Sequence, residues 1–221
     1  MKSVKYGLLG LALMAFVPTF AQEEVENEGA VGWTPVAVGI ATPIQLPWGI
    51  NKWDVFGLDL NLLYSDAPKM YGLDLGGLAT TTRDESMGLI VGGLANLGFK
   101  DVYGWRATLG LNYSDKESTL YGLDTGLCAY NKQFVGADIS FLFNFTTEEF
   151  WGLQMAGIFN YAEKVHGMQF ALICNIAKEL EGCQLSLVNI ASDCTAGFQI
   201  GLVNVIQTNV VPVLPIVNGY F

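Results

Sequence analysis

Large apolar residues alternate with small or polar residues along most of this chain, in short runs that each begin at a glycine. After Gly57, for example, the apolar side chains are Leu58, Leu60 and Leu62, and smaller or polar side chains stand between them. A period of two residues is typical of a β-strand with one apolar face, whereas an amphipathic helix repeats every 3.6 residues. The pattern therefore predicts strands.

The runs recur at nearly constant spacing. Successive anchor glycines lie 14 to 18 residues apart, and most intervals are 15 or 16 residues. Turn-forming and charged stretches such as SDAPK, TRDES and SDKES separate the runs. Ten such units predict ten strands of roughly eight to ten residues, each followed by a short turn. The anchor glycines are Gly57, Gly72, Gly88, Gly104, Gly122, Gly136, Gly152, Gly167, Gly182 and Gly197.

The second residue after each anchor glycine forms a mostly polar column. One interpretation is a polar track that lines a lumen or a binding surface. The other, which we favour, is a hydrated or mutually hydrogen-bonded row with no catalytic geometry. With Ile90 as the apolar exception, the column comprises Asp59, Asp74, Arg106, Asp124, Asp138, Gln154, Gln169, Gln184 and Gln199.

Two further strand-like segments, residues 33–46 and 209–221, flank the ten units. Pro35, Pro43, Pro212 and Pro215 lie within them. Because proline belongs on edge strands or at strand starts, these segments are expected to be terminal strands that meet or cap the array. The total is then about twelve short strands.

The strand array predicts an all-β protein and leaves two architectures open. We favour a closed antiparallel up-and-down barrel of the outer-membrane type, with an apolar outside and a small or polar inside. The alternative is a parallel β-solenoid, in which the last residue of the motif would form an asparagine ladder. Stacking in a solenoid would place Asp59 on Asp74 and Asp124 on Asp138, and repulsion between ionised carboxylates argues against it. The ladder would comprise Asn160, Asn175, Asn189 and Asn204.

The four cysteines, Cys128, Cys174, Cys183 and Cys194, match no metal-binding or redox spacing. In an antiparallel hairpin, Cys174 would end one strand and Cys183 would begin the next. The barrel therefore predicts that these two thiols lie close enough for a disulfide.

The N-terminal pattern predicts export from the cytoplasm, and the net charge disfavours a nucleic-acid partner. Residues 1–21 have the basic start, apolar run and small-residue end of a secretory signal peptide, and residues 22–32 form an acidic leader. Residues 33–221 are then a single β-repeat domain. A net charge of -10 disfavours a polyphosphate partner. Outer-membrane lipid is the expected partner, and a protein or polysaccharide is the alternative.

The phrases GFQIGLVN, GCQLSLVN, GMQFALICN and GLQMAGIFN resemble the bacterial surface-repeat family, exported proteins built from tandem repeats of the GLQIGLVN type. The likeness covers about residues 33–221. It implies a location in the outer membrane or on the cell surface of a Gram-negative-type bacterium. It implies no chemistry that could be transferred to particular residues.

The sequence offers little for catalysis. It has one histidine, His166, and no phosphate-binding loop or metal-ligand spacing. We therefore expect no enzyme and no cofactor. The expected function is that of a structural envelope component or small passive pore. The alternative is a soluble or surface-displayed β-solenoid that binds a partner or polysaccharide through its Gly/Gln face.

Overall fold

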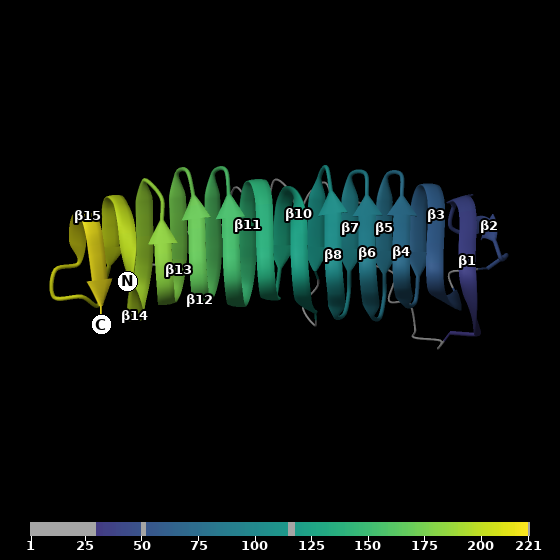
Figure 1. Cartoon of the computed structure of the whole chain (residues 1–221), viewed down its shortest axis with the longest axis horizontal. Coiled ribbons are helices and arrows are strands. Elements are labelled where there is room, and N and C mark those ends of the chain that lie inside the picture. The colour runs from purple at the N-terminus through teal and green to yellow at the C-terminus, as the bar shows by residue number, and fades with distance from the viewer. Residues whose placement is uncertain (1–29, 50–51, 115–117, 221) are drawn as a thin grey trace, which may run out of the picture.

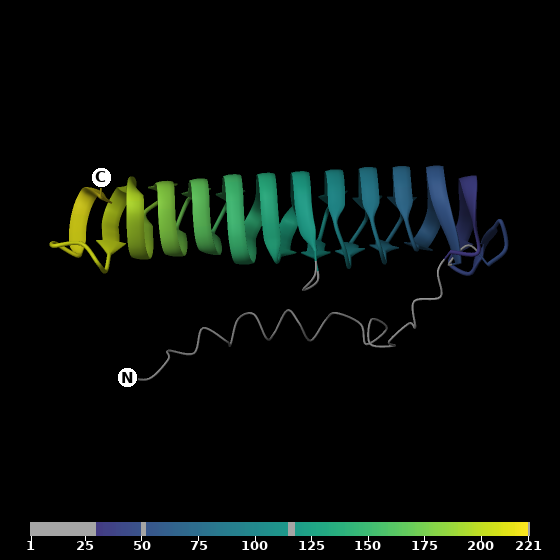
Figure 2. The ribbon, with the colours of Figure 1, turned by 90° about the horizontal axis from the view of Figure 1, so that it is seen from below.

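The chain winds into a straight rod of stacked coils (Figures 1 and 2). The computed structural model describes residues 30–49, 52–114 and 118–220. Its fold is a parallel β-solenoid of about 10 turns. The prediction of an all-β protein is confirmed. The favoured closed antiparallel barrel is wrong, and the solenoid alternative is right.

In the part of the chain that the structure describes, fifteen strand segments build the rod, against the twelve strands expected, because several coils are divided into two short strands. The segments are β1 (Gly32–Ala41), β2 (Ile44–Leu46), β3 (Trp53–Ala67), β4 (Met70–Gly76), β5 (Ala79–Thr82), β6 (Ser86–Gly92), β7 (Ala95–Gly98), β8 (Val102–Thr108), β9 (Leu111–Ser114), β10 (Thr119–Asn131), β11 (Gln133–Ala156), β12 (Phe159–Ala171), β13 (Cys174–Leu185), β14 (Val188–Ile206) and β15 (Val213–Tyr220).

Neighbouring coils pair in parallel, with equivalent residues of the repeat in register. Gly167 pairs with Gly182, and Gly182 pairs with Gly197 in the next coil. The same register holds at the other end of the array, where Gly57 pairs with Gly72. Each repeat is therefore one full coil, stacked about 4.8 Å from the next.

The backbone explains the glycine of the repeat. Gly182 has φ 137° within β13, a conformation that residues with a side chain rarely adopt. A Cβ atom at Gly182 would also lie 2.0 Å from the carbonyl oxygen of Gly167 in the coil before it. The anchor glycine is thus required both by its own dihedral angle and by the close approach of the next coil.

Each coil has two faces and two edges, which we name by their residues. The glycine face carries the segments that follow the anchor glycines, such as β4, β6 and β8, and the asparagine face carries β5, β7, β9 and the first parts of β12 to β14. The apolar edge is the turn five and six residues after each anchor glycine. The charged edge is the opposite turn, three and four residues before it. In Figure 1 the thin connections between arrows along the top mark the apolar edge.

The interior combines an apolar column with amide columns. The residue two positions before the anchor glycine points inward beside the charged edge, where it forms the larger hydrophobic cluster together with small residues of the asparagine face. The rest of the interior, toward the apolar edge, is filled by buried polar side chains. The apolar column includes Val102, Leu120, Phe134, Phe150, Val165 and Leu180.

The two flanking segments cap opposite ends of the rod. β2 pairs antiparallel with β1, and β15 pairs antiparallel with β14, whereas all the coils between them pair in parallel. These antiparallel strands, β2 directly after Pro43 and β15 with Pro215 inside it, cover edges that could otherwise template further pairing. The expected signal peptide, residues 1–21, and residues 22–29 of the expected leader lie outside the described residues. β1 begins at Gly32, within one residue of the predicted domain boundary.

Candidate functional site

The predicted polar column runs through the interior of the rod. Its nine polar members are each at most 1% exposed, and Ile90 is paired between Asp74 and Arg106. The column therefore lines neither a lumen nor a binding surface. The Gly/Gln face proposed for a partner does not exist as a surface, because the glutamine side chains point inward.

The glutamines form a continuous side-chain ladder. Gln169 Nε2 donates to Gln154 Oε1 at 2.8 Å, and Gln184 Nε2 donates to Gln169 Oε1 at 2.7 Å. Gln199 Nε2 extends the chain to Gln184 Oε1 at 2.7 Å. The two inner amides, Gln169 and Gln184, thus bond a neighbour on each side as donor and as acceptor, which compensates for the loss of water.

The asparagine ladder that the solenoid alternative predicts is present on the other side of the interior. Asn160 Nδ2 donates to Asn175 Oδ1 at 2.9 Å, and Asn175 Nδ2 donates to Asn189 Oδ1 at 3.1 Å. Asn175 Nδ2 also lies 3.0 Å from the carbonyl oxygen of Leu185, near the apolar edge. The asparagine ladder therefore links successive coils and also fixes the backbone near the turns of the apolar edge.

Arg106 replaces the amide pattern in the middle of the rod. Its guanidinium meets Asp124 Oδ2 at 2.7 Å and donates to Asn131 Oδ1 at 2.8 Å and to Ser114 Oγ at 2.9 Å. Ala129 occupies the position where other repeats carry their asparagine and is paired with Asn144, and Asn131 stands two residues beyond it. This displacement brings an amide to Asp124 and to Asp138 Oδ2, at 3.3 and 3.4 Å.

The acidic pairs that argued against a solenoid do stack, Asp59 on Asp74 and Asp124 on Asp138. Burial raises the pKa of Asp59 to about 6, and burial together with the charge of Asp59 raises the pKa of Asp74 well above its ordinary value. Burial and then Asp124 likewise raise the pKa of Asp138. A raised pKa favours the neutral form of a carboxyl, which reduces the repulsion within each pair.

The cysteines are free thiols. Cys174 and Cys183 lie near opposite ends of one strand, β13, so the hairpin that would have brought them together does not form. Cys174 is paired with Val188, and Cys183 with Phe198, in the following coil. The structure therefore does not support the expected disulfide between Cys174 and Cys183.

The outer surface carries the repeated features that a partner could contact. Along the apolar edge every repeat exposes at least one large apolar side chain, from Leu127 at 37% to Leu109 at 83% exposed. The row is continuous, because the backbone N–H of Leu94 donates to Leu78 and that of Leu78 donates to Leu63. Its members are Leu62, Leu63, Leu78, Leu94, Leu109, Leu127, Phe141, Ile158, Leu172, Ile173, Leu187, Leu202 and Val203.

Aromatic side chains stack in short rows on both faces, parallel to the rod axis. On the glycine face the rows follow the residues just before the anchor glycines, where Phe56 and Tyr71 stack at 4.9 Å between ring centroids and Trp151 and His166 at 4.0 Å. On the asparagine face Tyr113, Tyr130, Phe145 and Tyr161 form one stack with centroid distances of 5.3, 5.5 and 4.4 Å. Because the rings cover one another's faces, they present mainly their edges and hydroxyl groups outward.

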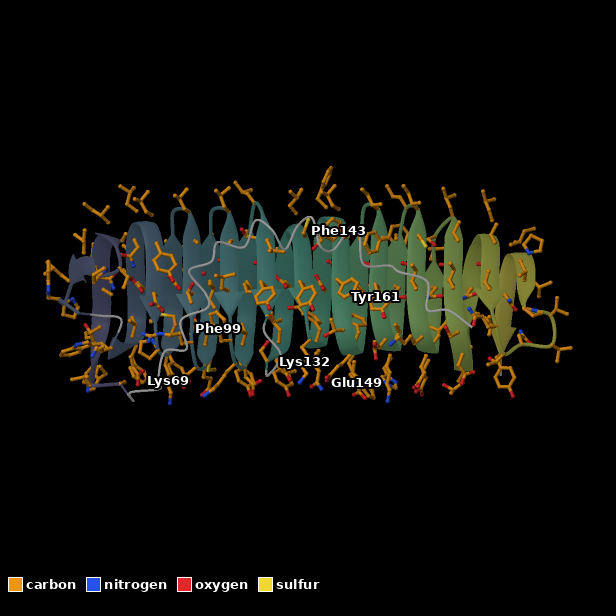
Figure 3. The ribbon with its side chains drawn as sticks, turned by 180° about the vertical axis from the view of Figure 1, so that it is seen from behind. Lys69, Phe99, Lys132, Phe143, Glu149 and Tyr161 are labelled. Carbon is orange, nitrogen blue, oxygen red and sulfur yellow. The ribbon has the colours of Figure 1, made fainter. Side chains whose placement is uncertain are left out.

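The charged edge carries ion pairs between successive coils. Lys164 lies between Glu149 and Glu179, at 3.6 and 3.9 Å, and Lys178 pairs with Glu163. These side chains are partly exposed, so each pair contributes little to stability. Figure 3 shows Lys132 and Glu149 along this edge, opposite a row of carbon-only side chains.

Two shallow hollows, of about 550 and 350 Å³, lie where the glycine face meets the apolar edge. Leu60, Leu62 and Leu75 contribute to the first, and Phe170, Leu187 and Leu202 to the second. Both linings are apolar, so neither hollow brings together groups for acid–base chemistry. In the sequence, the mostly apolar position five residues after the anchor glycine indicated this surface. The barrel hypothesis assigned that position to the outside of a closed sheet.

Comparison with protein-family models, with curated proteins and with solved structures finds no match to this chain. Within residues 30–49, 52–114 and 118–220, no three or more His, Cys, Asp or Glu side chains are grouped so that they could hold a metal ion. The same residues contain no helix with the length and apolar character needed to span a membrane.

Proposed function

We propose that this protein is a non-enzymatic, surface-displayed β-solenoid, a rod of the bacterial cell envelope that binds a partner along its length. The observation that carries this proposal is the continuous apolar edge, to which every repeat contributes. The repeat resemblance and the signal-like residues 1–21 support export to the envelope. A passive pore finds no support, because the interior is filled by hydrogen-bonded columns.

The chemistry of the polar groups agrees with a structural task. The Gln, Asn and Arg side chains of the interior bond one another, away from any substrate. Exposed charges such as Lys164, Glu149 and Lys178 form ion pairs at the edge opposite the apolar one. A nucleic-acid partner is disfavoured by the net charge of -10.

Export and display can be tested in a Gram-negative host that expresses the whole chain. We expect the protein in the envelope fraction, with a mature N-terminus near Gln22, and cleavable by a protease added to intact cells. A control periplasmic protein should resist the protease. Recovery in the cytosol with Met1 retained would contradict the proposal.

A further inference from the structure

We propose that the apolar edge docks on a lipid bilayer, so that the rod lies along the membrane surface with its row of Leu, Ile and Phe side chains among the acyl chains. This inference rests on the proposed function, because it names the partner of the same surface. We identify the partner only by its chemistry, as an apolar layer with a polar surface.

The first argument is the extent of the edge. About 10 coils stacked about 4.8 Å apart give a row about 50 Å long. All ten repeats contribute to it, and Leu109, Phe141 and Leu62 are 83, 74 and 69% exposed. Soluble proteins rarely leave a continuous apolar surface of this length without a partner.

The second argument is the order of side chains from one edge to the other. On the asparagine face Phe143 lies toward the apolar edge, Tyr161 lies midway, and Glu149 lies at the charged edge (Figure 3). The aromatic row there is three to four residues from the apolar edge, about 10 Å along a strand. Tyrosine and tryptophan favour the boundary between hydrocarbon and water, and interfacial elements insert to about this depth.

The third argument is the position of the charges. Every outward-facing charged residue that the structure describes lies within six residues before an anchor glycine, at or beside the charged edge. Asp66, the farthest of them from its anchor glycine, is paired with Arg83 at 3.2 Å. Insertion of the apolar edge would therefore take no ionised side chain out of water, which is the costly step for a membrane contact.

A second copy of the chain fits this surface less well. The apolar edge is only one or two side chains wide in each coil, so two such edges in contact would cover the row itself but leave open the apolar hollows beside it, at the border with the glycine face. A fluid bilayer can cover the edge and both flanks together. With a net charge of -10 and no basic cluster along the edge, the rod should favour neutral over anionic headgroups.

Flotation of the purified full-length chain with phosphatidylcholine vesicles tests the proposal. We expect the wild type to float, and the variant Leu109→Glu/Phe141→Glu/Leu172→Glu to lose at least about tenfold in vesicle affinity. The matched control is Val210→Glu, which changes a 96% exposed apolar residue in the loop before β15 and should float like the wild type. Far-UV circular dichroism verifies that each variant keeps its strands.

Three results would overturn the docking model: a wild type that stays with the protein-only fraction, a triple variant that still floats, or a dimer in vesicle-free solution that only the triple variant disrupts. Stronger flotation with phosphatidylglycerol than with phosphatidylcholine would contradict the expected lipid preference. A surface-displayed chain that fails to float would refute docking alone. A chain that floats through its edge but is retained in the cytosol would refute the proposed function alone.

Discussion

Arg106 and Asp124 form a buried ion pair, 2.7 Å apart, at the level of the column where later coils carry glutamine. The pair lies between Ile90 on one side and Asp138 on the other. Burial and then the charge of Asp124 raise the pKa of the neighbouring Asp138, whereas the charge of Arg106 lowers it.

Removal of one partner of this pair should be far more damaging than removal of both. We expect Arg106→Gln to lower the free energy of unfolding by about 3–5 kcal/mol, because Asp124 is left buried without its cation. The double variant Arg106→Gln/Asp124→Gln should recover most of the loss by extending the amide ladder. Urea unfolding measures both. A double variant no more stable than the single one would show that the amide ladder does not extend through this part of the column.

The anchor glycine should tolerate no side chain. Gly152 has φ 126°, and a Cβ atom there would lie 2.1 Å from the carbonyl oxygen of Gly136. We expect Gly152→Ala to destabilise the fold by at least about 3 kcal/mol, through backbone strain and the clash with the preceding coil. The control is Gly126→Ala, whose nearest neighbours are two side-chain atoms at 3.0 Å and whose φ is not in the positive region. Equal melting temperatures of the two variants would contradict this explanation of the repeat.

The glutamine ladder should be sensitive to charge. Gln184→Glu would place a carboxylate where Gln184 now donates to Gln169 Oε1, with no cation nearby among its ladder neighbours. We expect a loss of about 3 kcal/mol or more at pH 7, and partial recovery at pH 4 as the introduced carboxyl is protonated. Gln207→Glu, at an exposed position, is the matched control. Thermal denaturation at the two pH values gives the comparison.

The stacked carboxyls of Asp59 and Asp74 should make the free energy of unfolding fall as pH rises. The folded-state pKa values of Asp59 and Asp74 are raised, so the folded chain binds these protons more tightly than the unfolded chain does. The contribution of Asp59 to the free energy of unfolding, about 3 kcal/mol, is fully present below about pH 4 and is lost as pH rises through about 6. Asp74, whose pKa is also raised, changes the free energy of unfolding in the same direction.

Asp74→Asn removes one of these two groups and should flatten the dependence of unfolding free energy on pH between 4 and 8. Glu149→Gln, at the charged edge, should leave that dependence unchanged. A wild type that gains stability over this pH range relative to Asp74→Asn would show that the carboxyls are ionised in the folded state.

Much of the coil could be predicted from the sequence because its signals are local. The period of two, the spacing of the anchor glycines and the inward direction of the polar column all follow from how side chains alternate along a strand. The asparagine ladder also followed once coils were assumed to stack, as the bond between Asn160 and Asn175 illustrates.

Strand direction was predicted wrongly because it depended on the charge state of Asp59 and Asp74. The repulsion argument assumed two ionised carboxylates, and their pKa values are set by burial that only the folded coil creates. The pairing of Cys174 with Cys183 was a consequence of the wrong strand direction, since it was derived from an antiparallel hairpin and the two residues lie in one strand. The partner of Arg106, eighteen residues away at Asp124, likewise depends on the stacking of coils.

The uniform parallel register also bears on how such a chain can change over generations. Each coil presents the same pattern of glycine, amide and apolar side chain to the coil before it and the coil after it. Duplication or loss of about fifteen codons would therefore lengthen or shorten the rod by one layer and leave the other joints intact. Recombination between repeats offers this protein a simple way to adjust its reach, while the two end strands stay as they are.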